Sequence, residues 1–136
     1  MKNLKFVLGV LLSLVMFSAC SNDDESGIEL YDPEVIFGDS SNAQIRNGLT
    51  GHLRYNEYNN SWTISYCHPG TYDSVEEYYP LNLPAEFKTD KEGGMDVSFS
   101  GKIAEMTDKD IQTLRIILLG GHRYYFVYLT DIELIN

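Results

Sequence analysis

Apolar and polar residues alternate along much of this chain, which is the pattern of β-strands with one buried face. The most regular segment is 95–103, whose apolar positions are Met95, Val97, Phe99, Gly101 and Ile103. Segments 45–55 and 61–67 alternate more loosely, and a polar stretch separates them. We predict a strand over 95–103 and a hairpin formed by 45–55 and 61–67.

Proline marks the next two elements. Segment 75–81 reads as an edge strand or an irregular extended segment, because Pro80 has no N–H to donate to a sheet. Pro84 is placed to begin one helical turn over 84–88.

The end of the chain predicts a second hairpin. Segment 113–119 is apolar at nearly every position, and the aromatic segment 123–134 follows after Gly120 and Gly121. Two glycines between strands favour a tight hairpin, because glycine adopts positive φ angles without steric cost.

These elements indicate an all-β fold. No helical apolar periodicity longer than two turns is found, and five or six strands fit a small closed barrel better than a sandwich, which usually needs about seven. We predict a five- to six-stranded barrel with at most short helical turns.

The first twenty residues have the layout of an export signal. Lys2 and Lys5 precede an apolar run, 6–17, which is shorter than the about 20 residues that cross a bilayer. Cys20 comes directly after Phe-Ser-Ala, which resembles the lipobox of bacterial lipoproteins. The resemblance implies removal of 1–19, acylation of Cys20 and an outer-membrane lipoprotein of the cell envelope.

The residues behind Cys20 predict a flexible tether. Segment 21–26 is polar and acidic, so it cannot bury enough surface to offset its ordering entropy. It also resembles the surface-export signal of lipoproteins from the Bacteroidota, and a plain solvated linker is the alternative. The predicted organisation is a signal peptide (1–19), a lipidated cysteine with tether and lead-in (20–44), and a single β-barrel domain (45–136).

Charge argues against nucleic acid as a partner. The chain has 10 Lys and Arg against 20 Asp and Glu, a net charge of −10. Removal of Lys2 and Lys5 with the signal would make this −12, a field that repels phosphate backbones. The lipid is then the expected membrane contact.

Three short motifs resemble a recurring pattern in small Bacteroidota lipoproteins. They are Asn-Leu-Pro-x-x-Phe-Lys at 82–88, Val-x-Phe-Ser-Gly at 97–101 and Leu-Thr-x-Ile at 129–132. The closest named group is the NigD-like lipoproteins, whose N-terminal part is similar to an OB-fold barrel. The resemblance covers about residues 46–134 and implies a small OB-like barrel.

The matching residues have structural roles in that resemblance. Phe87 and Phe99 would fill the barrel, Pro84 would start the capping turn, and Gly101 would let its strand bend. None of the matching positions is catalytic, and a fold does not establish a function.

Cys67 beside His68 is the nearest approach to a nucleophile with a base. If Cys20 is acylated, Cys67 has no partner for an intramolecular disulfide, and a free cysteine is most often a small buried hydrophobe. Adjacent strand residues face opposite sides, so the pair is badly placed for proton transfer. Other groups that the fold could bring to Cys67 are His52, His122 and Asp131.

Metal and cofactor motifs are not found in the sequence. The acidic pairs around 90–92 and 108–110 lack the spacing of a calcium loop, and three scattered histidines make no zinc signature. We therefore expect no cofactor.

The chain is rich in tyrosine, with ten in all. Strand packing explains many of these rings, but tyrosines on both faces of 123–134 predict that some reach solvent or a partner. The binding candidates are Tyr58, Trp62, Tyr79 and Tyr125. Ser74 lies in a three-residue stretch that resembles the O-glycosylation motif of the Bacteroidota.

Two functions from different classes follow. The first is a non-enzymatic, lipid-anchored envelope protein that binds a protein, peptide or glycan, including an inhibitor or immunity-type partner of a secreted enzyme or toxin. The second is a small hydrolase that uses Cys67.

Overall fold

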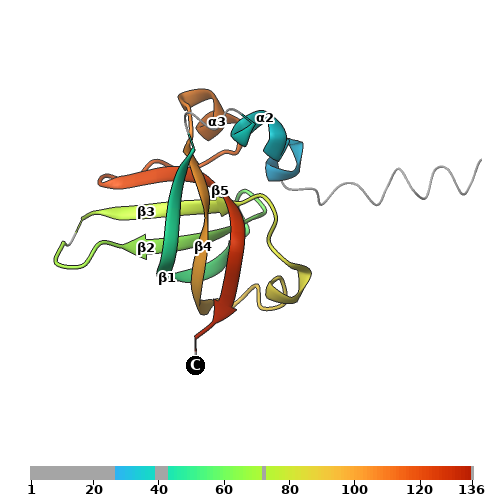
Figure 1. Ribbon diagram of the computed structural model, residues 1–136. Helices are drawn as coiled ribbons and strands as arrows, with labels where there is room; N and C mark the ends of the chain where they lie inside the picture. The colour runs from blue at the N-terminus through green and yellow to red at the C-terminus, as the bar shows by residue number, and fades with distance from the viewer. Residues whose placement is uncertain (1–26, 39–42, 72, 136) are drawn as a thin grey trace, which may run out of the picture.

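The protein is a closed five-stranded β-barrel (Figure 1). The computed structural model describes residues 27–38, 43–71 and 73–135. The strands are β1 (Gln44–Asn56), β2 (Ser61–Cys67), β3 (Val75–Pro80), β4 (Met95–Glu105) and β5 (His122–Leu134). Their order around the barrel is β1-β2-β3-β5-β4. This confirms the predicted all-β, five- to six-stranded OB-like barrel.

The helices among the described residues are short. They are η1 (Gly27–Leu30), α2 (Pro33–Phe37), η2 (Ala85–Phe87) and α3 (Asp108–Thr113). Pro84 precedes η2, as predicted, and Thr107 and Asp110 cap α3 reciprocally. None of these helices is long and apolar enough to span a membrane.

The barrel interior is filled by alternating residues of every strand. Phe99 of β4 is fully buried and packs edge-on against Tyr78, with 5.3 Å between ring centroids. Leu53, Ile64 and Val97 are also fully buried there. The predicted core position of Phe99 is therefore confirmed.

Gly101 lies at a bulge in β4. The pairing of β4 with β5 shifts register between Ser100 and Gly101, and a Cβ at Gly101 would collide with the carbonyl oxygen of Tyr128. Only glycine fits this close approach of two strands, so the expected bend at this residue is present.

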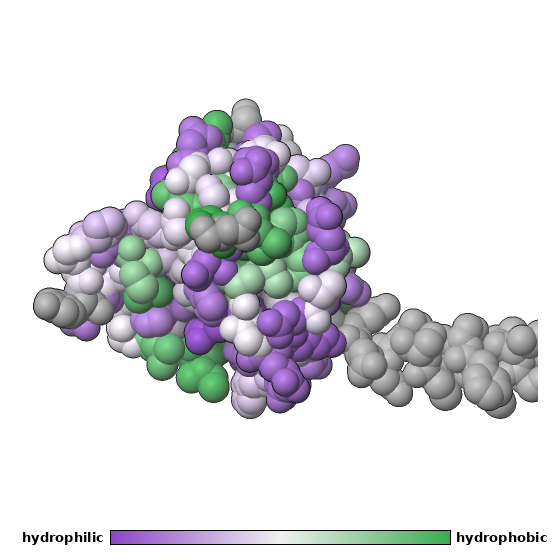
Figure 2. Space-filling view, turned by 90° about the horizontal axis from the view of Figure 1, so that it is seen from below, coloured by the Kyte–Doolittle hydropathy of each residue, from purple (hydrophilic) through white to green (hydrophobic). Residues whose placement is uncertain are grey.

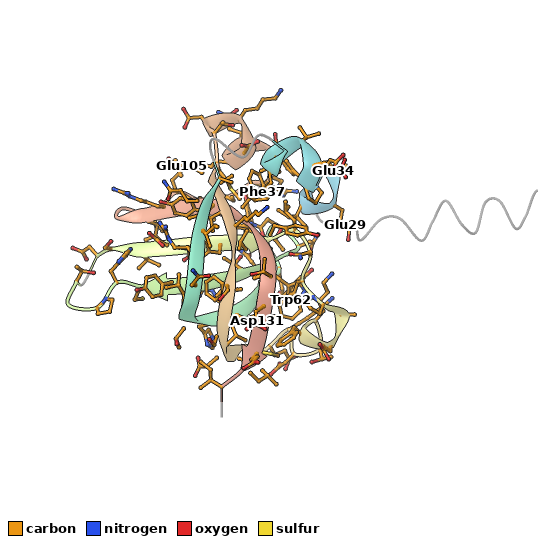
Figure 3. The ribbon with its side chains drawn as sticks, viewed as in Figure 1. Glu29, Glu34, Phe37, Trp62, Glu105 and Asp131 are labelled. Atoms are coloured by element: carbon orange, nitrogen blue, oxygen red, sulfur yellow. The ribbon has the colours of Figure 1, made fainter. Side chains whose placement is uncertain are left out.

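A second apolar cluster lies outside the barrel, under the short helices. Tyr124 and Phe126 of β5 are buried there, and Tyr31 packs on Phe126 with 4.7 Å between ring centroids. Figure 3 shows Phe37 of α2 pointing toward the barrel and Glu34 pointing away. Residues 27–38 thus pack on the barrel ahead of its predicted start at 45, because they cover the outer face of β5.

The prediction of a second hairpin at Gly120 and Gly121 is wrong. Residues 108–113 form α3, and 114–121 are a loop, so no strand precedes the two glycines. β5 pairs instead with β3, in parallel, which a two-residue turn cannot connect. The apolar run of this segment belongs partly to the second cluster, through Leu114 and Ile116.

β3 is an interior strand of the barrel, so the expectation of an edge strand is also wrong. It pairs with β2 on one side and β5 on the other. Pro80 is its last residue, where a missing N–H interrupts nothing. Asn82 then extends the pairing, because its side chain accepts from Leu129 N at 2.7 Å and donates to Leu129 O at 2.9 Å.

Candidate functional site

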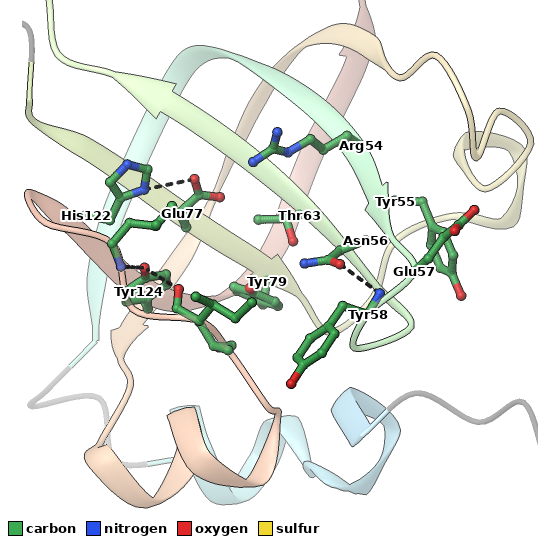
Figure 4. Close-up of a pocket in the computed structure, with 13 residues that line it drawn as sticks. Arg54, Tyr55, Asn56, Glu57, Tyr58, Thr63, Glu77, Tyr79, His122 and Tyr124 are labelled. Atoms are coloured by element: carbon green, nitrogen blue, oxygen red, sulfur yellow. Dashed lines mark hydrogen bonds and ion pairs between the residues drawn. The ribbon is translucent and has the colours of Figure 1, made fainter.

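An external groove runs between the β1–β2 turn and the loop 114–121 (Figure 4). Its volume is about 500 Å³, within the range of ligand sites. Strands β2, β3 and β5 supply its floor through outward-facing side chains, and the turn and the loop supply its two walls. We call this site the groove.

The floor of the groove holds a buried carboxylate. The Glu77 side chain is 7% exposed, its Oε2 accepts a hydrogen bond of 2.9 Å from Ser65 Oγ, and its Oε1 lies 3.3 Å from His122 Nδ1. That nitrogen makes no hydrogen bond of good geometry. Buried carboxylates need partners, so Glu77 is the group in the floor best suited to attract a cation.

Tyr79 lies beside Glu77 in the floor, two positions along β3. Burial raises the pKa of its hydroxyl above the ordinary value, and the Thr63 side chain offsets part of this rise. The hydroxyl therefore stays protonated at neutral pH and can donate or accept a hydrogen bond.

One wall of the groove is an exposed apolar loop. Ile117, Leu118 and Leu119 are exposed by 62%, 67% and 53%. Tyr124 of the floor holds this loop in place, because its hydroxyl accepts from Leu119 N at 3.0 Å and donates to Ile117 O at 3.2 Å. Three consecutive large apolar side chains are thereby presented to solvent.

The opposite wall is the β1–β2 turn, with Tyr58 at its rim. Tyr58 is 57% exposed, and its backbone N–H donates to Asn56 Oδ1 at 2.9 Å. The guanidinium of Arg115 lies 5.4 Å from the centre of the Tyr58 ring and so bridges the two walls.

The structure brings two of the predicted binding residues together. Tyr58 and Tyr79 both line the groove, although Tyr79 is only 4% exposed and forms part of its floor. Trp62 is partly buried, packs on Tyr55 with 5.2 Å between ring centroids, and lines a separate cavity.

The expectation of an exposed ring is wrong for Tyr79 and for Tyr125. Tyr125 faces the barrel interior, where it stacks on Tyr78 with 5.5 Å between ring centroids. The outer face of β5 is covered by the second cluster, so both faces of its first half are buried. The tyrosine of β5 that does reach solvent is Tyr128, which was not among the binding candidates.

Cys67 is exposed, so the expectation of a buried thiol is wrong. It ends β2 on the opposite face from Tyr66 and His68, whose rings pack together with 5.1 Å between centroids. His68 Nε2 lies 3.0 Å from Glu76 Oε1. No hydrogen bond joins Cys67 to a histidine among the described residues, so the geometry does not favour the cysteine hydrolase.

Two other predicted sites stand apart from the groove. Ser74 is partly buried just before β3, and its carbonyl accepts from His68 N at 3.1 Å. Cys20, with the predicted signal and tether, lies outside the described residues. Within the described part of the chain, no three His, Cys, Asp or Glu side chains are grouped to hold a metal.

No family model matches the chain, and no curated protein matches it. Fold and site therefore define this protein as a small five-stranded β-barrel with an external groove of aromatic, apolar and acidic groups.

Sequence reasoning missed the acidic floor and the apolar wall. Glu77 and His122 are 45 positions apart, and no motif signals that a parallel pairing brings them into contact. The apolar run Ile117, Leu118 and Leu119 is evident in the sequence, but its pattern predicts a strand and not an exposed loop.

Proposed function

We propose that this protein is a lipid-anchored, non-enzymatic binding protein of the cell envelope, and that the groove takes a segment of a partner protein. The observation that carries this proposal is the apolar wall, where Ile117 and Leu119 line the groove and Leu118 lies between them, all three more than half exposed. Contiguous exposed apolar groups beside a polar rim are typical of protein interfaces. Acylation of Cys20 would supply the anchor.

A protein segment suits the groove better than a glycan does. Sugars stack on free aromatic faces, but the guanidinium of Arg115 already lies over the ring of Tyr58. The apolar wall also offers no hydrogen-bonding side chains for hydroxyl groups. A partner with apolar side chains gains from burying this wall, at about 25 cal/mol per Å² of apolar surface.

Charge favours a basic partner. The chain carries a net charge of −10, and one of its carboxylates, Glu77, is buried in the groove floor. A field of this sign speeds association with a basic protein and discriminates against acidic ones. An inhibitor or immunity-type role toward a basic secreted enzyme or toxin fits this chemistry.

The test compares two leucines of equal exposure. Leu119 in the groove is 53% exposed and Leu134 at the end of β5 is 55% exposed. The protein is used to capture partners from its own cells and culture medium, and the partner identified is then titrated. Leu119→Ser and Tyr58→Ala should each weaken its affinity about tenfold or more, as interface anchors do, with Leu134→Ser unchanged.

Salt dependence gives the second readout. Affinity for a basic partner should fall as ionic strength rises, because screening weakens the attraction. Equal losses from Leu119→Ser and Leu134→Ser would contradict the groove as the binding site, and a partner that is a glycan would contradict the protein class.

A further inference from the structure

The barrel has a polar mouth that the proposed function does not use. Where β3 and β5 begin, a cavity of about 280 Å³ opens into the end of the barrel. The charged groups that line it are Arg46, Glu76, Glu105 and Arg123, and the buried residues Ile103 and Tyr125 lie at its inner end. Figure 3 shows Glu105 near the end of β4.

Glu76 is satisfied by neighbours inside the barrel. Its side chain is 7% exposed, the Tyr78 hydroxyl donates to one carboxylate oxygen, and His68 Nε2 lies 3.0 Å from the other. Arg46 Nη2 is 4.0 Å from this carboxylate, too far for a hydrogen bond. Arg46 also interacts with the Tyr78 hydroxyl, and its guanidinium has further N–H donors beyond these contacts.

Arg123 also has donors to spare. No carboxylate of the described residues lies within 4.0 Å of its guanidinium, since none of the ion pairs found there involves it. A guanidinium presents several N–H donors in a planar fork that matches a carboxylate. Two such groups, Arg46 and Arg123, line the same small cavity.

The charges of the mouth select the kind of ligand. Two arginines and two glutamates sum to zero, in a chain whose net charge is −10. A simple anion would add negative charge here, whereas a zwitterion would not. Glu105 has no ion pair among the described residues and can accept an ammonium group.

We propose that the barrel mouth binds a free α-amino acid. Its carboxylate pairs with Arg46 and Arg123, and its ammonium group pairs with Glu105. This site is independent of the groove, because the two cavities share no lining residue.

The test uses L-valine and two analogues that each lack one of its charged groups. L-valine carries both charges, isovalerate lacks the ammonium group, and isobutylamine lacks the carboxylate. Each is titrated into the full-length protein while the NMR signals of the Ile103 methyl groups and the arginine side-chain N–H groups are followed. L-valine should give saturable shifts, and each half-ligand should bind at least about tenfold more weakly, since each lacks one charge-assisted contact.

A matched pair of variants locates the site. Arg123→Gln should weaken L-valine binding about tenfold or more through loss of a charge-assisted pair. Lys109→Gln, which removes one positive charge from exposed α3, should leave it unchanged. Absence of saturable shifts with L-valine, equal binding of isovalerate, or equal losses in both variants would each overturn the proposal.

Discussion

Neighbouring residues of β3 have different roles because strand side chains alternate between faces. Glu76 and Tyr78 face the barrel interior, where the tyrosine hydroxyl donates to the carboxylate. Glu77 and Tyr79 face outward and form the floor of the groove. A single strand thus contributes to the core, to the mouth and to the groove.

Phe99 is expected to contribute to the stability of the fold, whereas Tyr58 is expected to contribute to binding only. Phe99 is fully buried, so Phe99→Ala should lower the free energy of unfolding by about 3–5 kcal/mol. Tyr58 is 57% exposed, so Tyr58→Ala should change it by no more than about 0.5 kcal/mol. Urea unfolding measures both. Unfolding of the protein by Tyr58→Ala would contradict the placement of this ring at the groove rim.

Tyr78 should make stability fall at alkaline pH. Burial raises the pKa of its hydroxyl above the ordinary value, and the hydrogen bond to Glu76 and the charge of Glu76 add to this rise. The folded state therefore holds this proton more tightly than the unfolded state. Its contribution is complete below about pH 10, the unfolded pKa of tyrosine, and declines as pH rises above it.

Tyr78→Phe removes that proton, so the unfolding free energy of the variant should decline less steeply above about pH 10. Urea unfolding at neutral and alkaline pH gives the measurement. Tyr31→Phe is the comparison, because burial also raises the pKa of Tyr31, which lies outside the barrel. If the unfolding free energy of Tyr78→Phe declined with pH as steeply as that of the unchanged protein, Tyr78 would not be the cause of the alkaline loss of stability.

At the scale of elements, the loop 114–121 owes its position to groups at its two ends. The helix α3 ends where Arg115 adopts a φ of 58°, and Ile116 N then donates to Ile111 O at 3.0 Å. This is a helix-ending motif that usually uses glycine. From the other side, the Tyr124 hydroxyl bonds to the loop backbone.

Figure 2 shows one face of the molecule, on which the hydrophobic patches are separated by hydrophilic surface.

Tyr124→Phe tests whether this hydroxyl holds the loop. The variant loses bonds to Leu119 N and Ile117 O, so the free energy of unfolding should fall by about 0.5–1.5 kcal/mol per bond at most. Hydrogen exchange of the Leu119 amide should become faster, while that of Val97 in β4 should not. Unchanged exchange at Leu119 would contradict the role given to Tyr124.

At the scale of the whole molecule, the proposed attachment to a membrane depends on one residue, Cys20, which precedes the described residues.

Cys20→Ser should abolish acylation, because a hydroxyl cannot replace the thiol that takes the lipid. Labelling of growing cells with a fatty-acid analogue measures this directly, and the protein should label while the variant should not. Cys67→Ser is the matched control and should label fully, since Cys67 lies in the folded domain. Strong labelling of Cys20→Ser would contradict the lipoprotein proposal.

Local features of the fold could be predicted from the sequence. The alternation over 95–103 identified β4 and the core position of Phe99, and the polar stretch 56–60 placed the first turn. Pro84 identified the start of η2. These features depend on neighbours within a few positions, because side-chain alternation and turn chemistry are properties of the local chain.

Tertiary structure alone decided the site. The alternation along β3 shows which residues share a face, but it does not show that β5 is the neighbour that brings His122 to Glu77. It also does not show that residues 27–38 cover β5, or that Ile117 and its neighbours stay exposed. Strand pairing and the covering of outer faces depend on contacts between segments far apart in the chain, and periodicity carries no information about them.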